Sequence, residues 1–96
     1  MTKRGKSLVW TIKIEDSALK DLKRIDKTHA RRILDFLGLR VAKLRNPRSI
    51  GQALKGAELG DFWKYRVGDY RIICDIQDSI LLVLVLRIGN RRDIYR

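Results

Sequence analysis

Apolar and polar residues alternate along the first element that the sequence predicts, which spans residues 8–14. Trp10, Ile12 and Ile14 share one side, and polar residues occupy most of the positions between them. A repeat of two is typical of a β-strand with one buried face. We therefore expect the chain to begin with a half-buried strand.

Helical spacing follows this strand. Asp16 or Ser17 can cap a first helix, which we expect to end near Asp26. Its apolar residues recur at steps of three and four and form one stripe: Ala18, Leu19, Leu22 and Ile25. The opposite side, which carries Lys20, Lys23 and Arg24, is predicted to face water.

A second helix is predicted to start at Asp26 or Thr28. Its apolar stripe again has steps of three and four and consists of Ala30, Ile33, Leu34, Leu37, Val41 and Leu44. Its exposed side is mostly basic, with Lys27, Arg31, Arg32, Arg40 and Lys43. Gly38 weakens a helix by up to ~1 kcal/mol relative to alanine. Pro47 ends the pattern, because the residue before a proline disfavours the helical region.

A β-hairpin is the clearest later signal, with Gly68 and Asp69 between two runs of β-branched and aromatic residues. Glycine at the first central position suits a type II′ turn. That turn pairs Val67 with Tyr70, Arg66 with Arg71, and Lys64 with Ile73. Directly opposed residues share a face, so Lys64, Arg66 and Arg71 converge on one surface. The other surface is the expected core side: Trp63, Tyr65, Val67, Tyr70, Ile72 and Cys74.

The remaining segments complete an α+β fold of order β-α-α-β-β-β. Residues 49–60 read as a loop anchored by Leu54, and residues 80–88 form an apolar run typical of a strand covered on both faces. We expect a single domain over residues 1–96, with residues 1–7 as a flexible basic tail. Both helices should pack on one face of the sheet, so that the cationic side of the hairpin lies on the partly open face.

Charge narrows the possible partners. The chain has 22 Lys and Arg against 11 Asp and Glu, a net charge of +11, and a pI near 10.4. This excess favours nucleic acid first, an acidic protein second and an anionic membrane third. The sequence has no bilayer-spanning apolar run and no signal-peptide pattern, so we expect a cytoplasmic protein. Cys74, the only cysteine, is expected to be a buried structural thiol.

Standard catalytic sets are absent from the sequence. There is no Cys/His cluster for zinc, no acidic cluster for magnesium and no Walker loop, so no metal or cofactor is predicted. His29, the only histidine, is expected to be a solvated surface residue without a partner.

Cations and tyrosines can nevertheless support RNA cleavage without a metal, through attack of the 2′-hydroxyl on the neighbouring phosphorus. Arg66, Arg71 and Arg91 can clamp the phosphate. Lys64 and Tyr95, which we expect to lie among these cations, are the candidates for general acid or base. A surface that only binds acidic partners accounts for the same residues equally well.

The sequence resembles the RelE/ParE superfamily of toxins from bacterial toxin–antitoxin pairs, and within it the RelE branch. The likeness covers nearly the whole chain, and its specific parts are the hairpin at residues 63–71 and the ending at residues 88–95. It implies a curved antiparallel sheet with two N-terminal helices packed on one face. It also implies a metal-independent endoribonuclease that enters the ribosomal A site and cleaves mRNA there, inhibiting translation.

The resemblance assigns roles to individual residues. Lys64 and Arg66 match the hairpin bases of the family, Arg71 the arginine after the turn, Arg91 the arginine beyond the last strand, and Tyr95 the terminal tyrosine. It implies that Tyr95 or Lys64 activates the 2′-hydroxyl, that Arg66 and Arg71 stabilise the phosphate, and that Arg91 assists the leaving group. Further RNA contacts are expected from basic residues beside these: Lys55, Arg92 and Arg96.

Two departures from the family pattern stand out. Close relatives often carry histidine where this chain has Asn90, and an asparagine cannot exchange a proton near pH 7. The second departure is that we expect no C-terminal helix after Tyr95. If position 90 serves in acid–base work, Asn90 weakens or disables the enzyme.

The resemblance implies a cognate antitoxin as protein partner, the ribosome and mRNA as targets, and no membrane. Two alternatives remain at this point. The first is a ParE-like inhibitor of DNA gyrase without nuclease activity, and the second is a ribosome- or RNA-binding module that does not cleave.

Overall fold

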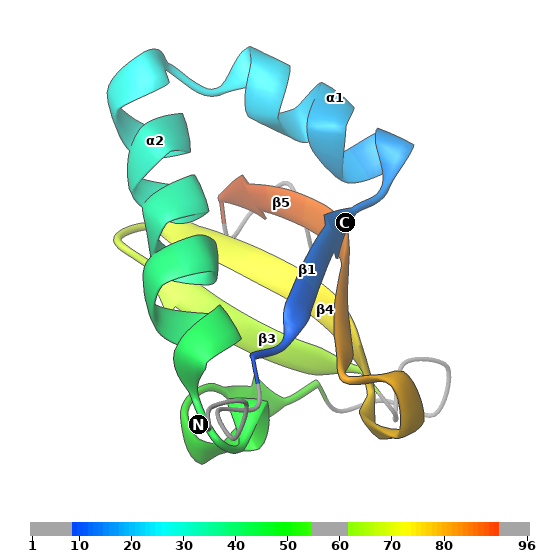
Figure 1. Cartoon of the computed structure of the whole chain (residues 1–96). Helices are drawn as coiled ribbons and strands as arrows, with labels where there is room; N and C mark the ends of the chain where they lie inside the picture. Colours follow the sequence, from blue (N-terminus) through cyan, green and yellow to red (C-terminus); the bar gives the residue numbers. More distant parts are fainter. Residues whose placement is uncertain (1–8, 55–61, 91–96) are drawn as a thin grey trace.

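The structure, a computed structural model, describes residues 9–54 and 62–90. The predicted tail at residues 1–7 lies outside the described residues. The described part contains a five-stranded sheet of order β1-β5-β4-β3-β2. In chain order the strands are Thr11–Ile14, Gln52–Ala53, Trp63–Val67, Tyr70–Gln77 and Leu82–Asn90. Helices α1, Asp16–Arg24, and α2, Lys27–Asp35, pack over one face of this curved sheet (Figure 1).

The α+β class and the helical layer are therefore as predicted, but the sheet differs from the predicted antiparallel sheet of order β-α-α-β-β-β in two ways. Strands β2 to β5 pair antiparallel, whereas β1 runs parallel to β5 and pairs Thr11 with Leu82 and Ile14 with Val85. Strand β2 lies inside the segment predicted as a loop and pairs with the start of β3. None of the described helices is both long and apolar enough to cross a membrane.

The hairpin of β3 and β4 has the predicted register. Val67 pairs with Tyr70, Arg66 with Arg71, and Lys64 with Ile73. Gly68 has φ +61°, and no positive φ occurs at Asp69, as a type II′ turn requires. The expected core side is confirmed, because Tyr65, Ile72 and Cys74 are buried while their aromatic neighbours are half-buried. Burial also raises the pKa of the Cys74 thiol, as befits a structural cysteine.

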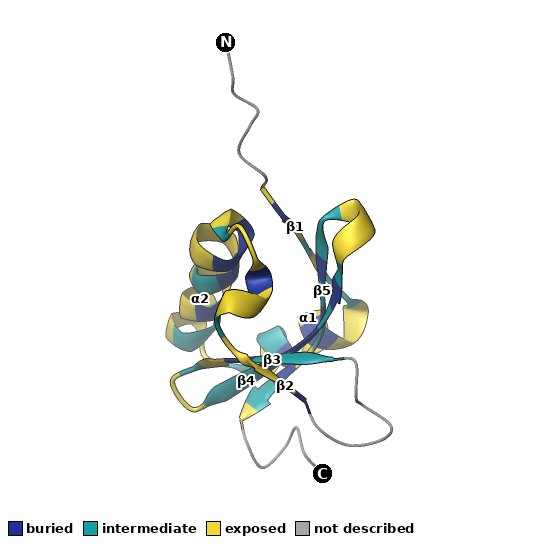
Figure 2. Ribbon diagram, turned by 90° about the horizontal axis from the view of Figure 1, so that it is seen from below, coloured by how far each residue is buried: buried dark blue, intermediate teal, exposed yellow. Residues whose placement is uncertain are grey.

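Strand β5 corrects one prediction about the sheet. The strand starts at Leu82, because residues Asp78–Ile80 form a 3-10 turn and Leu81 adopts a left-handed conformation with φ 52°. Residues that face the helices are buried, namely Val83, Val85 and Ile88. Those at alternate positions, Leu82, Leu84 and Leu86, are only half-buried. The strand is not fully covered on both faces because the helices pack on one of them (Figure 2).

Helix α1 differs from the prediction in its N-terminal cap and in which of its side chains are buried. Neither Asp16 nor Ser17 caps it: Glu15 holds the N-cap position without a side-chain bond, and the Ser17 hydroxyl donates to the Leu86 carbonyl oxygen at 2.8 Å. Leu19, predicted to be in the core, is 42% exposed, and Asp21 is buried instead. The helix therefore packs with polar groups against the edge of β5.

Asp21 is the centre of that contact. Its carboxylate accepts from the Ile88 backbone N–H at 2.8 Å and from Arg87 Nε at 2.9 Å. Strand β1 pairs with β5 only as far as Val85. Beyond that residue the Asp21 carboxylate, instead of β1, accepts the hydrogen bond from the backbone N–H of Ile88. Burial raises the pKa of Asp21, but the hydrogen bonds from Arg87 and Ile88 outweigh it and leave that pKa below its usual value.

Helix α2 begins as predicted, with the Asp26 side chain accepting from the His29 backbone N–H. Ile33, Leu37 and Val41 are buried, whereas Leu34 is 43% exposed and does not belong to the core stripe. Steps of four overshoot an α-helical turn by about 40° each. The chain continues as a π-helical segment, Phe36–Arg40, and then a 3-10 turn, Val41–Lys43. The wider π turn keeps the step-of-four residues on one face.

We predict that Asp21→Asn lowers the free energy of unfolding at pH 7 by about 1–3 kcal/mol, because a buried charge-assisted bond is lost. The folded-state pKa of Asp21 lies below its unfolded value. Its contribution is therefore present above about pH 4 and lost as pH falls through the folded pKa. Urea unfolding of both proteins from pH 7 to about pH 3 tests this, and the gap between them should close in acid.

The exposed Asp35→Asn, on the other helix, is the matched control for loss of one carboxylate. It should leave the unfolding free energy close to that of the wild type across the same pH range. Equal stability of the Asp21 and Asp35 variants at every pH would contradict the account of this contact.

Candidate functional site: a cationic cleft beside the hairpin

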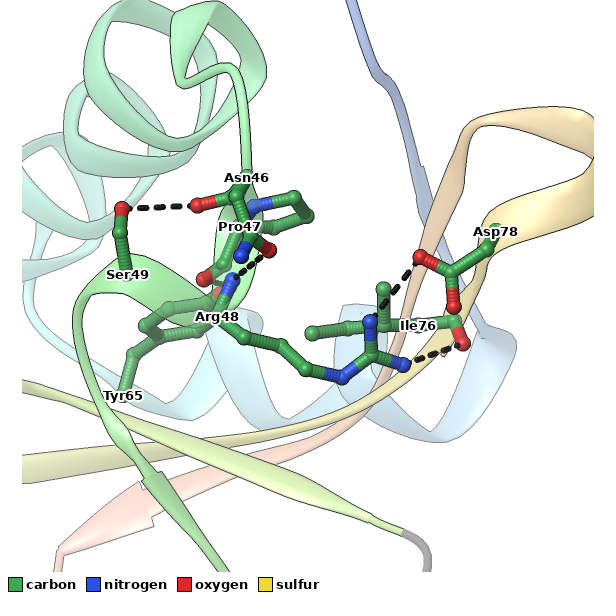
Figure 3. A network of polar contacts seen from close by, with 7 residues as sticks. All are labelled: Asn46, Pro47, Arg48, Ser49, Tyr65, Ile76 and Asp78. Atoms are coloured by element: carbon green, nitrogen blue, oxygen red, sulfur yellow. Dashed lines mark hydrogen bonds and ion pairs between the residues drawn. The ribbon is translucent and has the colours of Figure 1, made fainter.

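A polar network fixes the segment that joins the second helix to β2 (Figure 3). The Asn46 side chain accepts from the Arg48 backbone N–H at 2.9 Å and caps the 3-10 turn Pro47–Ser49. Arg48 reaches across to the end of β4, where it donates to the Ile76 carbonyl oxygen at 3.4 Å and, in the 3-10 turn that follows, to the Asp78 carboxylate at 2.9 Å. This segment is thus bound to the sheet at both its backbone and its side chains.

Tyr65 makes the buried contact within this network. Its hydroxyl donates to the Pro47 carbonyl oxygen at 2.6 Å, and both residues are drawn in Figure 3. Its ring meets that of Phe36 edge-on, with centroids 5.7 Å apart. Burial raises the pKa of Tyr65, so the hydroxyl remains a protonated donor at neutral pH. Because Tyr65 lies between Lys64 and Arg66, the contact also sets the position of these two cations.

A cleft of about 450 Å³ opens where the hairpin, the end of the second helix and β2 meet. The described residues that line it are Phe36, Arg40, Ile50, Gly51, Gln52, Lys64, Tyr65, Arg66 and Arg71. Four of these side chains are cationic and, within this described lining, none is acidic. Such a cleft attracts an anion and disfavours a cation.

The structure brings together the three hairpin cations that the sequence singled out. Lys64 and Arg71 are half-buried and Arg66 is exposed, with its Nε donating to the Gly68 carbonyl oxygen at 3.3 Å. Arg66 and Arg71 are direct cross-strand partners, an arrangement that costs a few tenths of a kcal/mol or more through like-charge repulsion. A phosphate between the two guanidinium groups relieves that repulsion through charge-assisted hydrogen bonds.

The other predicted site residues divide into two groups. Lys55, Arg91, Arg92, Tyr95 and Arg96 lie outside the described residues. Asn90 ends β5, where it pairs with Tyr70, while its neighbour Gly89 pairs with Arg71. Asn90 is not among the described residues that line the cleft, and it instead lines a hollow of about 200 Å³ with Asp21 and Arg24.

His29 is half-exposed but has partners, contrary to the prediction. Its Nδ1 lies 2.6 Å from the Asp26 carboxylate, and its ring lies 5.4 Å from that of Tyr70. The His29 hydrogen bond lowers the pKa of Asp26. In the described ranges, no three His, Cys, Asp or Glu side chains are close enough together to hold a metal ion.

Sequence reasoning missed the part of the cleft that lies outside the hairpin. Arg40 is exposed, as predicted, but its place in the cleft was not anticipated, and Gln52 was assigned to a loop rather than to a strand. Phe36 was the one sequence feature that could have indicated this part of the cleft. It is a large apolar residue outside the predicted apolar stripe, so it must pack against some other part of the protein. Its spacing of four from Arg40 places the two residues on the same side of a helix.

The sequence and the fold are both similar to those of known proteins. Residues 12–95 match the family model described as the ParE toxin of the type II toxin–antitoxin system parDE. Toxin RelG of Mycobacterium tuberculosis is 29% identical over 87 residues, which cover 91% of this chain and 97% of RelG.

Two solved structures extend the comparison. The toxin–antitoxin complex RelBE2 from Mycobacterium tuberculosis has a chain with TM-score 0.80 at 24% identity, covering 90% of this chain and 95% of that one. The archaeal RelE–RelB complex from Pyrococcus horikoshii gives TM-score 0.66 at 28% identity, over 86% of this chain and 96% of that one. The family match over residues 12–95, together with this shared fold, therefore defines a toxin of a type II toxin–antitoxin system.

The chain belongs to the ParE toxin family of the RelE/ParE superfamily and is a RelE-like member of it.

Gly51 gives a test of how closely the cleft is packed. It has φ +86°, and an added Cβ would lie 2.6 Å from the Lys64 carbonyl oxygen and 2.6 Å from Trp63 Nε1. We predict that Gly51→Ala lowers the free energy of unfolding by about 1–3 kcal/mol or more, measured by urea unfolding.

Gly38→Ala is the matched control, because nothing lies within 4 Å of a Cβ there. It should leave the free energy of unfolding unchanged or raise it by up to ~1 kcal/mol. Equal effects of the two substitutions would show that the described packing around Gly51 is wrong.

Proposed function

We propose that this toxin is a ribosome-dependent, metal-independent endoribonuclease that cleaves mRNA in the A site and so inhibits translation. The observation that carries the proposal is the clustering of Lys64, Arg66 and Arg71 with Arg40 around one cleft. This is a larger concentration of positive charge than folding requires, and RNA supplies the matching negative charge. The action on ribosomes places the protein in the cytoplasm.

The chemistry follows from the cleft. The 2′-hydroxyl attacks the adjacent phosphorus, the bond to the 5′-oxygen breaks, and a 2′,3′-cyclic phosphate forms. Arg66 and Arg71 stabilise the charge that develops on the phosphate oxygens, which is the largest single contribution in most enzymes of this kind. Lys64 or Tyr95 removes the 2′-hydroxyl proton, Arg91 stabilises the negative charge on the departing 5′-oxygen, and that oxygen then takes a proton from water.

Further RNA contacts are assigned to Lys55, Arg92 and Arg96. A cognate antitoxin is the proposed protein partner, since the similar RelE chain from Pyrococcus horikoshii was solved with RelB. An acidic segment of such a partner would neutralise the same cations that hold RNA.

A gyrase inhibitor is the second candidate, favoured by the match to the ParE family model. It would act by protein contact and would have no use for phosphate chemistry. The cross-strand pair Arg66 and Arg71 argues against it, because a repulsive pair inside a cleft is best accounted for by an anion between them.

We predict that Arg71→Ala lowers mRNA cleavage in a purified translation reaction by about 10²-fold or more, because a group that stabilises the transition state is lost. Primer extension on a defined mRNA locates and quantifies the cuts. Binding to ribosomes, measured by cosedimentation, should persist in this variant. The matched control is Arg32→Ala, which removes an exposed arginine that is not among the described residues of the cleft.

The same reaction with Asn90→His tests position 90. Asn90 pairs with Tyr70 rather than with Arg71, so we expect the wild type and this variant both to cut in the A-site codon. Cleavage by the histidine variant alone would mean that the natural chain is a disabled enzyme. Cleavage by neither would overturn the nuclease proposal and favour gyrase inhibition.

A further inference from the structure

The part of the cleft lining that lies outside the hairpin differs in character from the hairpin itself. It is made of Arg40 and Phe36 from the π-helical segment after α2, with Ile50 and Gln52 from the segment around β2. Apolar surface, one guanidinium group and one side-chain amide thus line the same cleft as three cations. A site that binds phosphate through charge alone has no need of the apolar residues or the amide.

The composition of this part fits one nucleotide. A nucleobase offers a flat apolar face and a polar edge, and its phosphate carries the charge. The volume of about 450 Å³ lies within the range of small-molecule sites. An arginine binds phosphate through two parallel hydrogen bonds, and a glutamine amide both donates to and accepts from a base edge.

The position of Arg40 does not depend on a flexible loop. The π-helical segment Phe36–Arg40 carries it, with Phe36 held edge-on against Tyr65 at the other end of the same turn. Gln52 is similarly constrained, because its backbone pairs with Lys64 in the sheet. Both side chains are therefore presented to the cleft by regular structure.

We infer that the cleft holds one nucleotide of the RNA, with Arg40 bound to a phosphate next to the cleaved one and Gln52 bound to the edge of the base. The inference rests on the proposed nuclease function and adds to it a source of sequence preference within the toxin. Phe36 and Ile50 supply the apolar surface against which the base lies.

The phosphate contact has a measurable signature in salt dependence. The probe is a fluorescent single-stranded RNA with 2′-O-methyl riboses, which cannot be cleaved by 2′-hydroxyl attack. Each phosphate contact contributes about 0.7 to the slope of log affinity against log salt concentration for single strands. Arg40→Ala should reduce the slope by about that amount and weaken all sequences alike.

Arg32→Ala removes the same charge from the same helix outside the described lining of the cleft, and it should leave the slope near that of the wild type. Equal slopes for the Arg40 and Arg32 variants would overturn the phosphate contact. A structural role of Arg40 would lower stability without a change of slope.

The base contact is tested with four RNAs that differ at one nucleotide. The wild type should prefer one base, and Gln52→Leu should bind all four with similar affinity while keeping the wild-type salt slope. Ala53→Ser, on the same short strand and exposed, is the control and should keep the preference. Retention of the preference in Gln52→Leu would overturn the base contact.

These outcomes separate this inference from the proposed function. A wild type that neither binds RNA nor cleaves mRNA on the ribosome contradicts both. A wild type that cleaves, with Arg40 and Gln52 variants that behave like their controls, contradicts only the nucleotide site.

Discussion

The hydrogen bond from the Tyr65 hydroxyl to the Pro47 carbonyl oxygen joins the sheet to the chain segment that follows the helices. It connects β3 to the segment that leaves the helical layer, and both groups are buried. Leaving the buried carbonyl and hydroxyl unpaired would cost a few kcal/mol, so this contact strongly favours the observed arrangement of the two segments. Phe36 packs against the same ring, and Arg48 binds the segment to β4. Tyr65 and the groups that contact it therefore fix the positions of the segments that line the cleft.

Repulsion between the like charges in the cleft destabilises the fold, and packing elsewhere in the structure offsets this destabilisation. Arg66 and Arg71 oppose each other across the hairpin, with Lys64 and Arg40 in the same cleft. Like charges at this spacing weaken the sheet, and a net charge of +11 adds long-range repulsion. The buried residues under the hairpin, Tyr65, Ile72 and Cys74, hold the strands together despite it. Binding of an anion then releases the repulsion, so the same residues that destabilise the free toxin favour its ligand.

Local sequence patterns were sufficient for the hairpin. Alternation assigned the two faces of β3 and β4, and Gly68 identified the turn and hence the register. The start of the second helix at Asp26 was one of the two predicted, and the residue whose N–H it caps, His29, is only three residues away. Each of these features depends only on residues that are close together in the sequence, so local patterns are enough to predict it.

Other features depend on residues far apart in the chain. Asp21 is buried because its carboxylate accepts from the backbone N–H of Ile88, 67 positions later in the chain. The local pattern does not show this partner, so it predicted that Leu19 rather than Asp21 would be buried. Arg40 reaches the cleft through a π-helical turn, and Gln52 through a short pairing with β3. Parallel pairing of β1 with β5 likewise follows from the whole topology and not from either strand alone.

The most direct test of the account is the chemistry of the RNA ends left after cleavage on the ribosome. An mRNA with a single 2′-deoxynucleotide at the cut position should resist the toxin, and the unmodified mRNA should yield a fragment ending in a 2′,3′-cyclic phosphate, identified by mass spectrometry. Cleavage of the deoxy-substituted mRNA, or a fragment ending in a free 3′-hydroxyl, would contradict 2′-hydroxyl attack in the cationic cleft.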